Sequence, residues 1–139
     1  MRDVLIATDS TTVRDEVAAV LSGRDYTVRT VTSGAAVRAA IAEQAPDLLV
    51  CDFQIGSMGG VAVTLDVRLE EGAGRIQRVP VLLLLDRRAD VFLARRSGAD
   101  GFLVKPLDPM RLRRAVAAVI DGSRFADDSY RPVGSAATG

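Results

Sequence analysis

The sequence contains no histidine and no tryptophan, and it has one cysteine, Cys51, and one lysine, Lys105. Without histidine, the chain cannot carry a phosphohistidine, a histidine general base or a histidine metal ligand. A single cysteine cannot form an intramolecular disulfide. All other basic residues are arginines, which makes the lone lysine a candidate for a specific role. The 18 basic residues balance the 18 acidic ones, and this zero net charge argues against binding to nucleic acid or to a membrane surface.

The sequence also lacks a signal-peptide pattern and an apolar run long enough to cross a membrane. Its most apolar stretch, residues 79–85, is only as long as a strand. We therefore expect a cytoplasmic protein with no membrane contact. A length of 139 residues is enough for one domain that buries roughly two-thirds of its unfolded surface.

Short apolar runs alternate along the chain with segments of helical periodicity. The predicted strands are residues 4–7, 26–31, 47–51, 79–85 and 102–104. Three of these runs are almost wholly apolar, which is typical of parallel strands that are covered on both faces. The predicted helices lie around residues 13–21, 37–41, 63–69, 89–97 and 112–120.

Five strands that alternate with five helices predict an α/β domain with a parallel five-stranded sheet and helices on both faces. Because crossover connections are right-handed, few topologies remain, and the flavodoxin-like strand order 2-1-3-4-5 is the common one for this number of strands. We predict this domain over residues 1–120. Residues 121–139 are polar and rich in glycine, serine and alanine, which predicts a mostly disordered tail and no second, output domain.

Polar residues stand at the carboxyl ends of these predicted strands: Thr8 and Asp9, Asp52, Asp86, and Lys105. In open α/β sheets, ligands bind beyond this edge. Taken alone, Asp9 suits a helix cap, Asp52 the start of a turn and Lys105 a solvated charge. Together, two carboxylates and the only lysine suit a hard cation and a phosphoryl group.

Two segments carry a specific family resemblance. The stretch DLLVCDFQIGSMGG resembles the segment around the phosphorylated aspartate in the receiver domains of bacterial two-component response regulators, and Asp52 falls on that aspartate. The stretch GADGFLVKP resembles the fifth strand of the same family, with Phe102 on its aromatic switch position and Lys105 on the lysine that contacts the acyl phosphate. The resemblance also implies a cis bond between Lys105 and Pro106, which proline makes chemically accessible.

The resemblance implies a phosphoacceptor signalling domain and not an enzyme, with self-phosphorylation and self-dephosphorylation as its only expected chemistry. Asp52 would accept a phosphoryl group from a sensor histidine kinase or a small phosphodonor. Mg²⁺ would bind Asp9, Asp52 and the backbone carbonyl of Gln54, because an aspartate reacts poorly with an anionic donor unless charge is neutralised. Lys105 would stabilise the phosphoryl charge.

The chain departs from the family pattern at several positions, three of which bear on the predicted site. Thr8 replaces the first of two adjacent acidic residues, which predicts a weak Mg²⁺ site that Thr8 supports only through a bound water. Leu85 replaces a threonine or serine whose hydroxyl binds the phosphoryl group and couples it to the aromatic switch, Phe102. Asp86 replaces a small residue. In the simplest interpretation it caps the following helix; alternatively it strengthens the metal site or repels the phosphate.

Seven arginines lie in or beside the last two predicted helices: Arg87, Arg88, Arg95, Arg96, Arg111, Arg113 and Arg114. In the family that the chain resembles, the face made by helix four, strand five and helix five commonly forms dimers or docks partners. A homodimer through this face and a simply solvated arginine-rich face are both compatible with the sequence. Nucleic-acid binding is not expected, since no helix-turn-helix remains.

Three functions are compatible with these observations. The first is an atypical stand-alone response regulator that takes part in phosphorelay signalling and acts on an unidentified protein target. The second is a degenerate receiver that serves as an interaction module without phosphate. The third is a flavodoxin-like binder of flavin or nucleotide, weakly suggested by the hydroxyl-rich residues 8–12. A phosphoryl adduct formed with Mg²⁺ would separate the first from the second, and a yellow purified protein would indicate the third.

Overall fold

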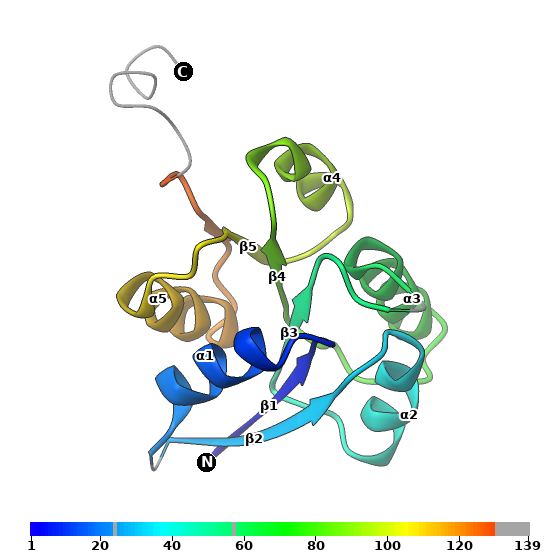
Figure 1. Cartoon of the computed structure of the whole chain (residues 1–139). Coiled ribbons are helices and arrows are strands. Elements are labelled where there is room, and N and C mark those ends of the chain that lie inside the picture. The colour runs from blue at the N-terminus through cyan, green and yellow to red at the C-terminus, as the bar shows by residue number, and fades with distance from the viewer. Residues whose placement is uncertain (24, 57, 130–139) are drawn as a thin grey trace.

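The chain folds into a parallel sheet that is covered by helices on both faces (Figure 1). The computed structural model describes residues 1–23, 25–56 and 58–129. The sheet order is β2-β1-β3-β4-β5-β6, and every pairing is parallel. The strands are β1 (Arg2–Ala7), β2 (Tyr26–Val31), β3 (Leu48–Asp52), β4 (Val81–Leu85), β5 (Gly101–Val104) and β6 (Phe125–Ala126). The predicted fold class and the order of the first five strands are confirmed.

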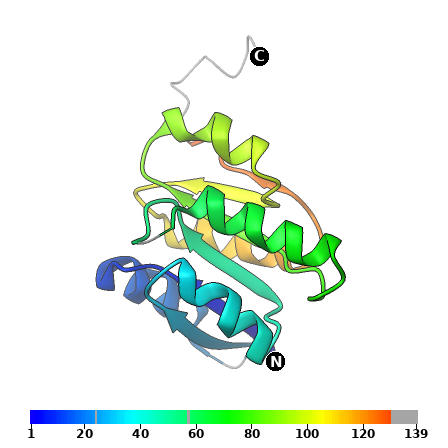
Figure 2. The ribbon, with the colours of Figure 1, turned by 90° about the vertical axis from the view of Figure 1, so that its right-hand side faces the viewer.

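The helices divide between the two faces of the sheet. They are α1 (Thr11–Leu21), α2 (Ala35–Glu43), α3 (Gly60–Gly72), α4 (Val91–Arg96), preceded by the short 3₁₀ turn η1 (Arg88–Asp90), and α5 (Pro109–Ile120). Apolar residues of α1 and α5 belong to one buried cluster, whereas those of α2, α3 and α4 belong to the other. Figure 2 shows α2, α3 and α4 stacked along their face of the sheet. None of the helices in the described ranges is long and apolar enough to span a membrane.

The central strands supply side chains to both clusters in alternation. In β4, Leu82 and Leu84 belong to the cluster under α1 and α5, whereas Leu83 and Leu85 belong to the opposite one. All four side chains are fully buried. Because successive side chains point to opposite faces, a strand that is covered on both faces must be apolar at every position. This requirement explains the wholly apolar run in the sequence.

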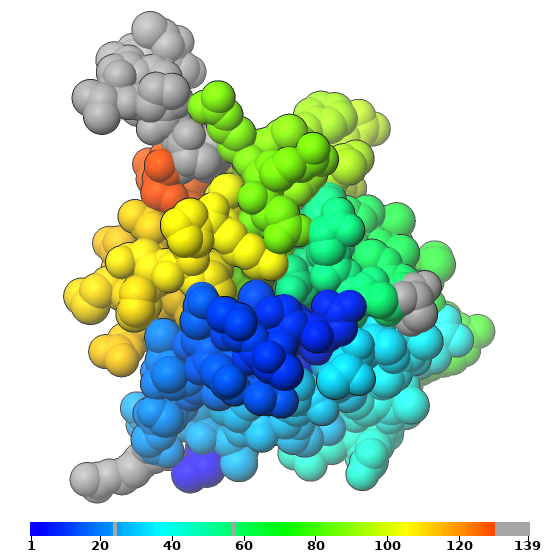
Figure 3. All heavy atoms as spheres, viewed as in Figure 1, coloured from blue at the N-terminus to red at the C-terminus, as the bar shows by residue number. Residues whose placement is uncertain are grey.

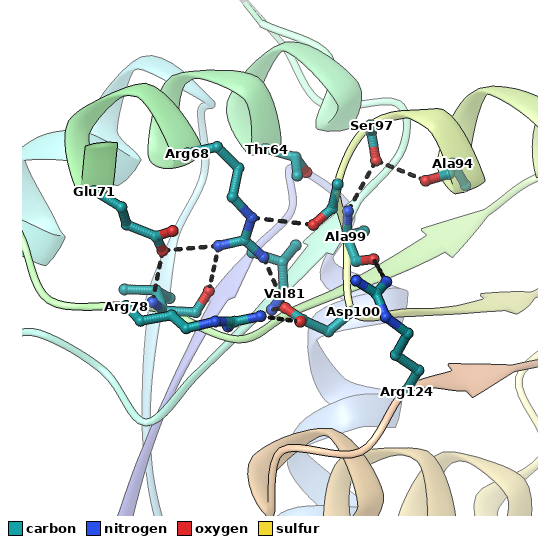
Figure 4. A network of polar contacts seen from close by, with 12 residues as sticks. Thr64, Arg68, Glu71, Arg78, Val81, Ala94, Ser97, Ala99, Asp100 and Arg124 are labelled. Atoms are coloured by element: carbon teal, nitrogen blue, oxygen red, sulfur yellow. Dashed lines mark hydrogen bonds and ion pairs between the residues drawn. The ribbon is translucent and has the colours of Figure 1, made fainter. Parts of the chain in front are cut away.

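A network of arginines and carboxylates ties α3 to the amino ends of β4 and β5 (Figure 4). The carboxylate of Asp100 accepts hydrogen bonds from Arg68, from Arg78 and from the backbone N–H of Val81. Arg68 also donates to Glu71 and to the carbonyl of Val79. The network lies at the end of the sheet opposite Asp52 and holds the framework together.

Residues after α5 belong to the fold, contrary to the prediction of a mostly disordered tail. Phe125 and Ala126 pair with Gly101 and Phe102 and add β6 to the sheet beside β5. The tail prediction is therefore wrong for residues 121–129, because a strand of two residues is too short to show a recognisable alternation. Residues 130–139 of the predicted tail lie outside the described residues.

Candidate functional site

A buried carboxylate, that of Asp52, lies at the carboxyl end of β3 and is 2% exposed. Its Oδ2 accepts a hydrogen bond of 2.8 Å from the hydroxyl of Thr8, directly after β1. Its Oδ1 accepts one of 2.7 Å from Nζ of Lys105, directly after β5. Figure 3 shows the blue, teal, green and yellow segments that follow β1, β3, β4 and β5 meeting on this face of the molecule. The structure thus brings together residues that are far apart in the sequence.

Lys105 is shared between two carboxylates. Its Nζ also donates a hydrogen bond of 3.0 Å to Oδ1 of Asp86, which follows β4. Burial lowers the pKa of Lys105, but its hydrogen bonds and charge interactions with Asp52 and Asp86 outweigh that effect, so the net pKa is raised. The ammonium therefore stays charged at neutral pH and offers a fixed cation beside Asp52.

Asp86 does not cap the following helix, so the simplest interpretation of this residue is wrong. The backbone N–H of Arg87 binds the carboxylate of Asp90 instead, which closes η1 before α4. Asp90 is buried and pairs with Arg87 through its other oxygen as well. The carboxylate of Asp86 contacts Lys105 and not the amino end of η1 or α4.

The hydroxyl of Thr8 is held by two hydrogen bonds. It donates its only proton to Asp52 and accepts the backbone N–H of Ser10 at 3.1 Å. Ser10 in turn caps α1, since its side-chain oxygen accepts the N–H of Val13. Thr8 therefore contacts the central carboxylate directly, and it retains a lone pair that a water could use.

The residues predicted to bind Mg²⁺ supply oxygen donors, which suit this ion. They offer one carboxylate fewer than the family pattern, because Thr8 replaces an acidic residue. Asp9 is exposed, and its Oδ2 accepts the backbone N–H of Gly56 at 3.0 Å. Gln54 lies exposed in the loop after β3. Among the described residues, no group of three or more carboxylate, thiolate or imidazole side chains is placed to hold a metal. Two carboxylates and a carbonyl still fit a hard cation that keeps several waters.

Gly60 allows α3 to begin against the backbone of Asp52. A Cβ at Gly60 would lie 2.8 Å from the carbonyl oxygen of Asp52, which is closer than side-chain carbons come to backbone oxygens. The N–H of Gly60 donates to the carbonyl of Phe53 at 2.9 Å. Glycine at this position therefore holds the loop after β3 close to the site. The sequence contains several glycines nearby, and only the three-dimensional contact identifies this one.

The two predicted switch residues, Leu85 and Phe102, are buried in the same apolar cluster. Leu85 is fully buried, and Phe102 is 4% exposed with the guanidinium of Arg95 5.4 Å from its ring centroid. Leucine offers no hydroxyl toward a phosphoryl group. Both predicted switch residues therefore lie in an apolar environment.

Two neighbouring features limit other chemistry at this site. Burial, and to a smaller extent the charge of Asp52, raises the pKa of Cys51 to about 12, so its thiol is not a nucleophile at neutral pH. The amino end of α1 is already capped by Ser10 and lies next to the carboxylate of Asp9. Both oppose the binding of an anionic phosphate at this helix end, as a flavin or nucleotide site would require.

A groove with a volume of about 630 Å³ runs between α1 and α5 and reaches the site. Its lining includes Val13 and Glu16 from α1, Leu112 from α5, and Lys105 with Leu107 between β5 and α5. Apolar side chains thus alternate with charged ones along a surface that leads to Lys105. Such a surface suits contact with another protein.

A parallel sheet covered by helices on both faces, with a buried aspartate and a charged lysine together at its carboxyl edge, is the arrangement of a signalling receiver domain. Comparison with known families agrees: the model of the response regulator receiver domain matches residues 4–117. The chain belongs to this family. The bond between Lys105 and Pro106 is cis, as the resemblance implied.

Individual relatives show the same similarity. The chain is 30% identical over 132 residues to the transcriptional regulatory protein AfsQ1 of Streptomyces coelicolor, covering 93% of this chain and 56% of that protein. It is 28% identical over 117 residues to the DNA-binding response regulator MtrA of Mycobacterium tuberculosis, covering 83% of this chain and 49% of that protein. The chain therefore spans about half the length of these relatives. Among solved structures, the chemotaxis response regulator CheY4 of Vibrio cholerae superposes with a TM-score of 0.75 at 26% identity, covering 86% of this chain and 98% of that one.

Proposed function

We propose that this chain is an atypical response regulator that accepts a phosphoryl group on Asp52 and passes the signal on by protein contacts. The observation that carries the proposal is the position of Asp52, buried between the hydroxyl of Thr8 and the ammonium of Lys105. A carboxylate in this setting is accessible only from the carboxyl edge of the sheet, where a donor phosphoryl group would arrive. The donor would be a sensor histidine kinase or a small phosphodonor.

In the proposed reaction, a carboxylate oxygen of Asp52 forms a bond to phosphorus as the bond to the donor's leaving group breaks. Lys105 would then shift its hydrogen bond from the carboxylate to a phosphoryl oxygen, where a charged donor is most valuable. Asp9, Asp52 and the carbonyl of Gln54 would hold Mg²⁺, which supplies further charge neutralisation when bound. Asp86 remains within reach of Lys105 and competes with the phosphoryl oxygens for it.

The groove between α1 and α5 supports docking of the phosphodonor protein, since it ends at Lys105 and offers both apolar and charged side chains. A donor that binds there would present its phosphoryl group to the same edge of the sheet. The downstream target is a protein that recognises the phosphorylated surface, and cytoplasmic action follows from this proposed partnership.

A second function, a receiver that acts as an interaction module without phosphate, is favoured by one specific observation. Leu85, which stands where the family pattern has a threonine or serine, is packed in one apolar cluster with Phe102. In that case Asp52 and Lys105 form a permanent ion pair that holds β3 and β5 together. Backbone amide shifts around Phe102 on addition of beryllofluoride and Mg²⁺ would show whether the site communicates with this cluster.

The test of phosphorylation is the intact mass after incubation with Mg²⁺ and acetyl phosphate. We expect a single phosphoryl adduct in the wild type and in Asp15→Asn, which removes an exposed carboxylate on α1. Asp52→Asn should form no adduct. An adduct that persists in Asp52→Asn would place the reaction on another residue. A wild type that stays unmodified at high Mg²⁺ and acetyl phosphate would count against phosphorylation and favour the interaction module.

A further inference from the structure

The loop of residues 105–108 connects β5 to α5 and carries Lys105 to the site. On one side the start of this loop is held by β4, because the N–H of Lys105 donates to the carbonyl of Leu85 at 2.8 Å. The preceding N–H, that of Val104, is buried and points to the other side of β5, where β6 runs. A buried N–H needs a partner, and this partner helps to decide where the loop begins.

The partner is the carboxylate of Asp127, which is 2% exposed. Its Oδ2 accepts the N–H of Val104 at 2.9 Å. Its Oδ1 accepts the N–H of Ser129 at 2.9 Å and lies 3.5 Å from Nε of Arg111, in the first turn of α5. Val104 directly precedes the loop of residues 105–108, and Arg111 follows it. One carboxylate therefore contacts the chain on both sides of the loop that carries Lys105.

The strand β6 fixes the backbone from which this carboxylate extends. The N–H of Phe125 donates to the carbonyl of Asp100 at 3.1 Å, and the N–H of Asp127 donates to the carbonyl of Phe102 at 3.3 Å. The two strands approach closely at Gly101, where a Cβ would lie 2.9 Å from the carbonyl oxygen of Phe125. The pairing with β5 therefore directs the side chain of Asp127 at the carboxyl end of that strand.

The position of the loop decides which carboxylate Lys105 contacts. Its Nζ lies 2.7 Å from Oδ1 of Asp52 and 3.0 Å from Oδ1 of Asp86. The side chain of Asp52 is 3% exposed and is held by Thr8, whereas that of Asp86 is 37% exposed. Asp52 therefore cannot follow a lysine that moves outward, and Asp86 can. Displacements of about 1 Å at a reacting group are enough to slow a reaction strongly.

We propose that Asp127 is a positioning residue for Lys105: it holds both ends of the loop of residues 105–108 and so keeps the ammonium on Asp52. The consequence for phosphorylation rests on the proposed function, whereas the consequence for Lys105 itself does not. The family model matches residues 4–117, so Asp127 lies outside the matched part of the chain. A segment beyond the matched region thus contributes to the site at the carboxyl edge of the sheet.

The experiment uses the fact that Lys105 is the only lysine in the sequence. Lysine labelled with ¹³C at Cε therefore gives a single side-chain signal, whose NMR order parameter reports how firmly Lys105 is held. Asp127→Ala removes both contacts of the carboxylate and should lower this order parameter. Asp127→Asn has nearly the same shape and keeps an oxygen that can accept the N–H of Val104, so its value should lie between those of wild type and Asp127→Ala. Asp127→Asn also decides the question if Asp127→Ala does not fold.

Two control variants separate positioning from a general loss of stability. Asp128→Ala removes an exposed carboxylate beside Asp127. Asp100→Asn removes a buried carboxylate of the same kind, which binds the N–H of Val81 and two arginines at the opposite end of the sheet. Both controls should keep the order parameter of Lys105 at the wild-type value, although Asp100→Asn is expected to be less stable.

The rate of phosphorylation provides the second measurement, by intact mass over time with Mg²⁺ and acetyl phosphate. Asp127→Ala should slow the reaction by about three- to tenfold, the equivalent of one hydrogen bond. If Asp127 acts through Lys105, the same substitution should have almost no effect in the Lys105→Ala background.

Three outcomes would overturn the proposal. In the first, Lys105 is as ordered in both Asp127 variants as in the wild type. In the second, Asp100→Asn lowers the order parameter of Lys105 as much as Asp127→Ala does, so that the change reflects stability alone. In the third, Asp127→Ala slows phosphorylation by the same factor with and without Lys105. A wild type that takes up no phosphoryl group would count against the proposed function, and the order parameter would still decide the role of Asp127.

Discussion

The hydroxyl of Thr8 donates a hydrogen bond of 2.8 Å to Oδ2 of Asp52, so a neutral group lies directly beside the proposed phosphoacceptor. In receivers of the usual pattern an acidic residue stands at the position of Thr8. The hydroxyl keeps Asp52 oriented without a cation, because it supplies a proton where two carboxylates would repel each other. We therefore expect the resting site to depend less on Mg²⁺ than a site with two adjacent carboxylates does.

The first prediction concerns metal affinity. Thr8→Asp should raise the affinity for Mg²⁺ by about tenfold, because two unit charges about 4 Å apart interact by roughly 4 kcal/mol at an effective dielectric of 20 and screening reduces this strongly. The same variant should unfold at a lower temperature without Mg²⁺ and recover when Mg²⁺ is added. Titration calorimetry and Mg²⁺-dependent melting measure both effects. Thr8→Ser keeps the hydroxyl and should behave as the wild type; equal Mg²⁺ affinity in Thr8→Asp would contradict the explanation.

The second prediction concerns the competition for Lys105. Asp86→Ala should speed phosphorylation by acetyl phosphate by roughly three- to tenfold, because it removes a negative charge near the site. It also frees Lys105 to donate hydrogen bonds to Asp52 and to the incoming phosphoryl group. Lys105→Ala should slow the reaction by about 10- to 100-fold, the equivalent of a hydrogen bond to a charged group. The rate is measured by intact mass over time.

A double-mutant cycle makes this second prediction specific. In the Lys105→Ala background, Asp86→Ala should have a much smaller effect, because the group for which Asp86 competes is gone. If Asp86→Ala gives the same acceleration in both backgrounds, Asp86 acts on the phosphodonor through general repulsion and not through Lys105.

The third prediction tests the close approach of α3 to the site. Gly60→Ala should lower the free energy of unfolding by about 1–3 kcal/mol, because the added methyl group would overlap the carbonyl oxygen of Asp52. Gly72→Ala is the matched control in the same helix, since a Cβ there meets no atom within 4 Å. That control should leave stability unchanged or raise it by up to about 1 kcal/mol. Urea unfolding measures both variants. If Gly60→Ala is as stable as the wild type, the loop after β3 moves to make room for the methyl group at no cost in free energy.

The fourth prediction concerns acid stability and the network in Figure 4. Burial raises the pKa of Asp100, but the hydrogen bonds from Arg78 and Val81 and the charge of Arg68 outweigh it, so the net pKa lies below the ordinary value of 3.8. The unfolded chain therefore binds a proton on this residue at a higher pH than the folded chain does. The stabilisation is complete above the unfolded value and is lost as pH falls through the folded pKa.

Asp100→Asn should accordingly be less stable than the wild type by about 2 kcal/mol near neutral pH, the contribution of hydrogen bonds to a charged group. The difference between the two proteins should shrink as pH falls below 3.8. Unfolding by urea at a series of pH values measures it. Asp128→Asn, at an exposed position, should follow the wild type throughout. If the difference in the free energy of unfolding stays constant down to low pH, the side chain of Asp100 stabilises the fold through its shape and not through its charge.

Much of the fold follows from the sequence, because a strand covered on both faces must be apolar throughout. The run of leucines in β4, from Leu82 to Leu85, predicts a central parallel strand, and it is fully buried. The predicted helices also match in position: the one around residues 89–97 coincides with η1 and α4, and the one around residues 112–120 lies within α5. β6 was not predicted, because two residues are too few to show the alternating pattern of a strand.

The sequence by itself determined the parallel α/β sheet and the meeting of Asp52 with Lys105 at one edge, since parallel strands all end on the same side. Only the tertiary structure shows which side chains form hydrogen bonds with these and neighbouring residues. Asp86 contacts Lys105 instead of capping a helix, and the carboxylate of Asp90 binds the N–H of Arg87 at the start of η1. Asp127 closes the edge of β5 through a contact 23 residues away in the chain. Such contacts depend on distances between elements, which no local pattern of residues encodes.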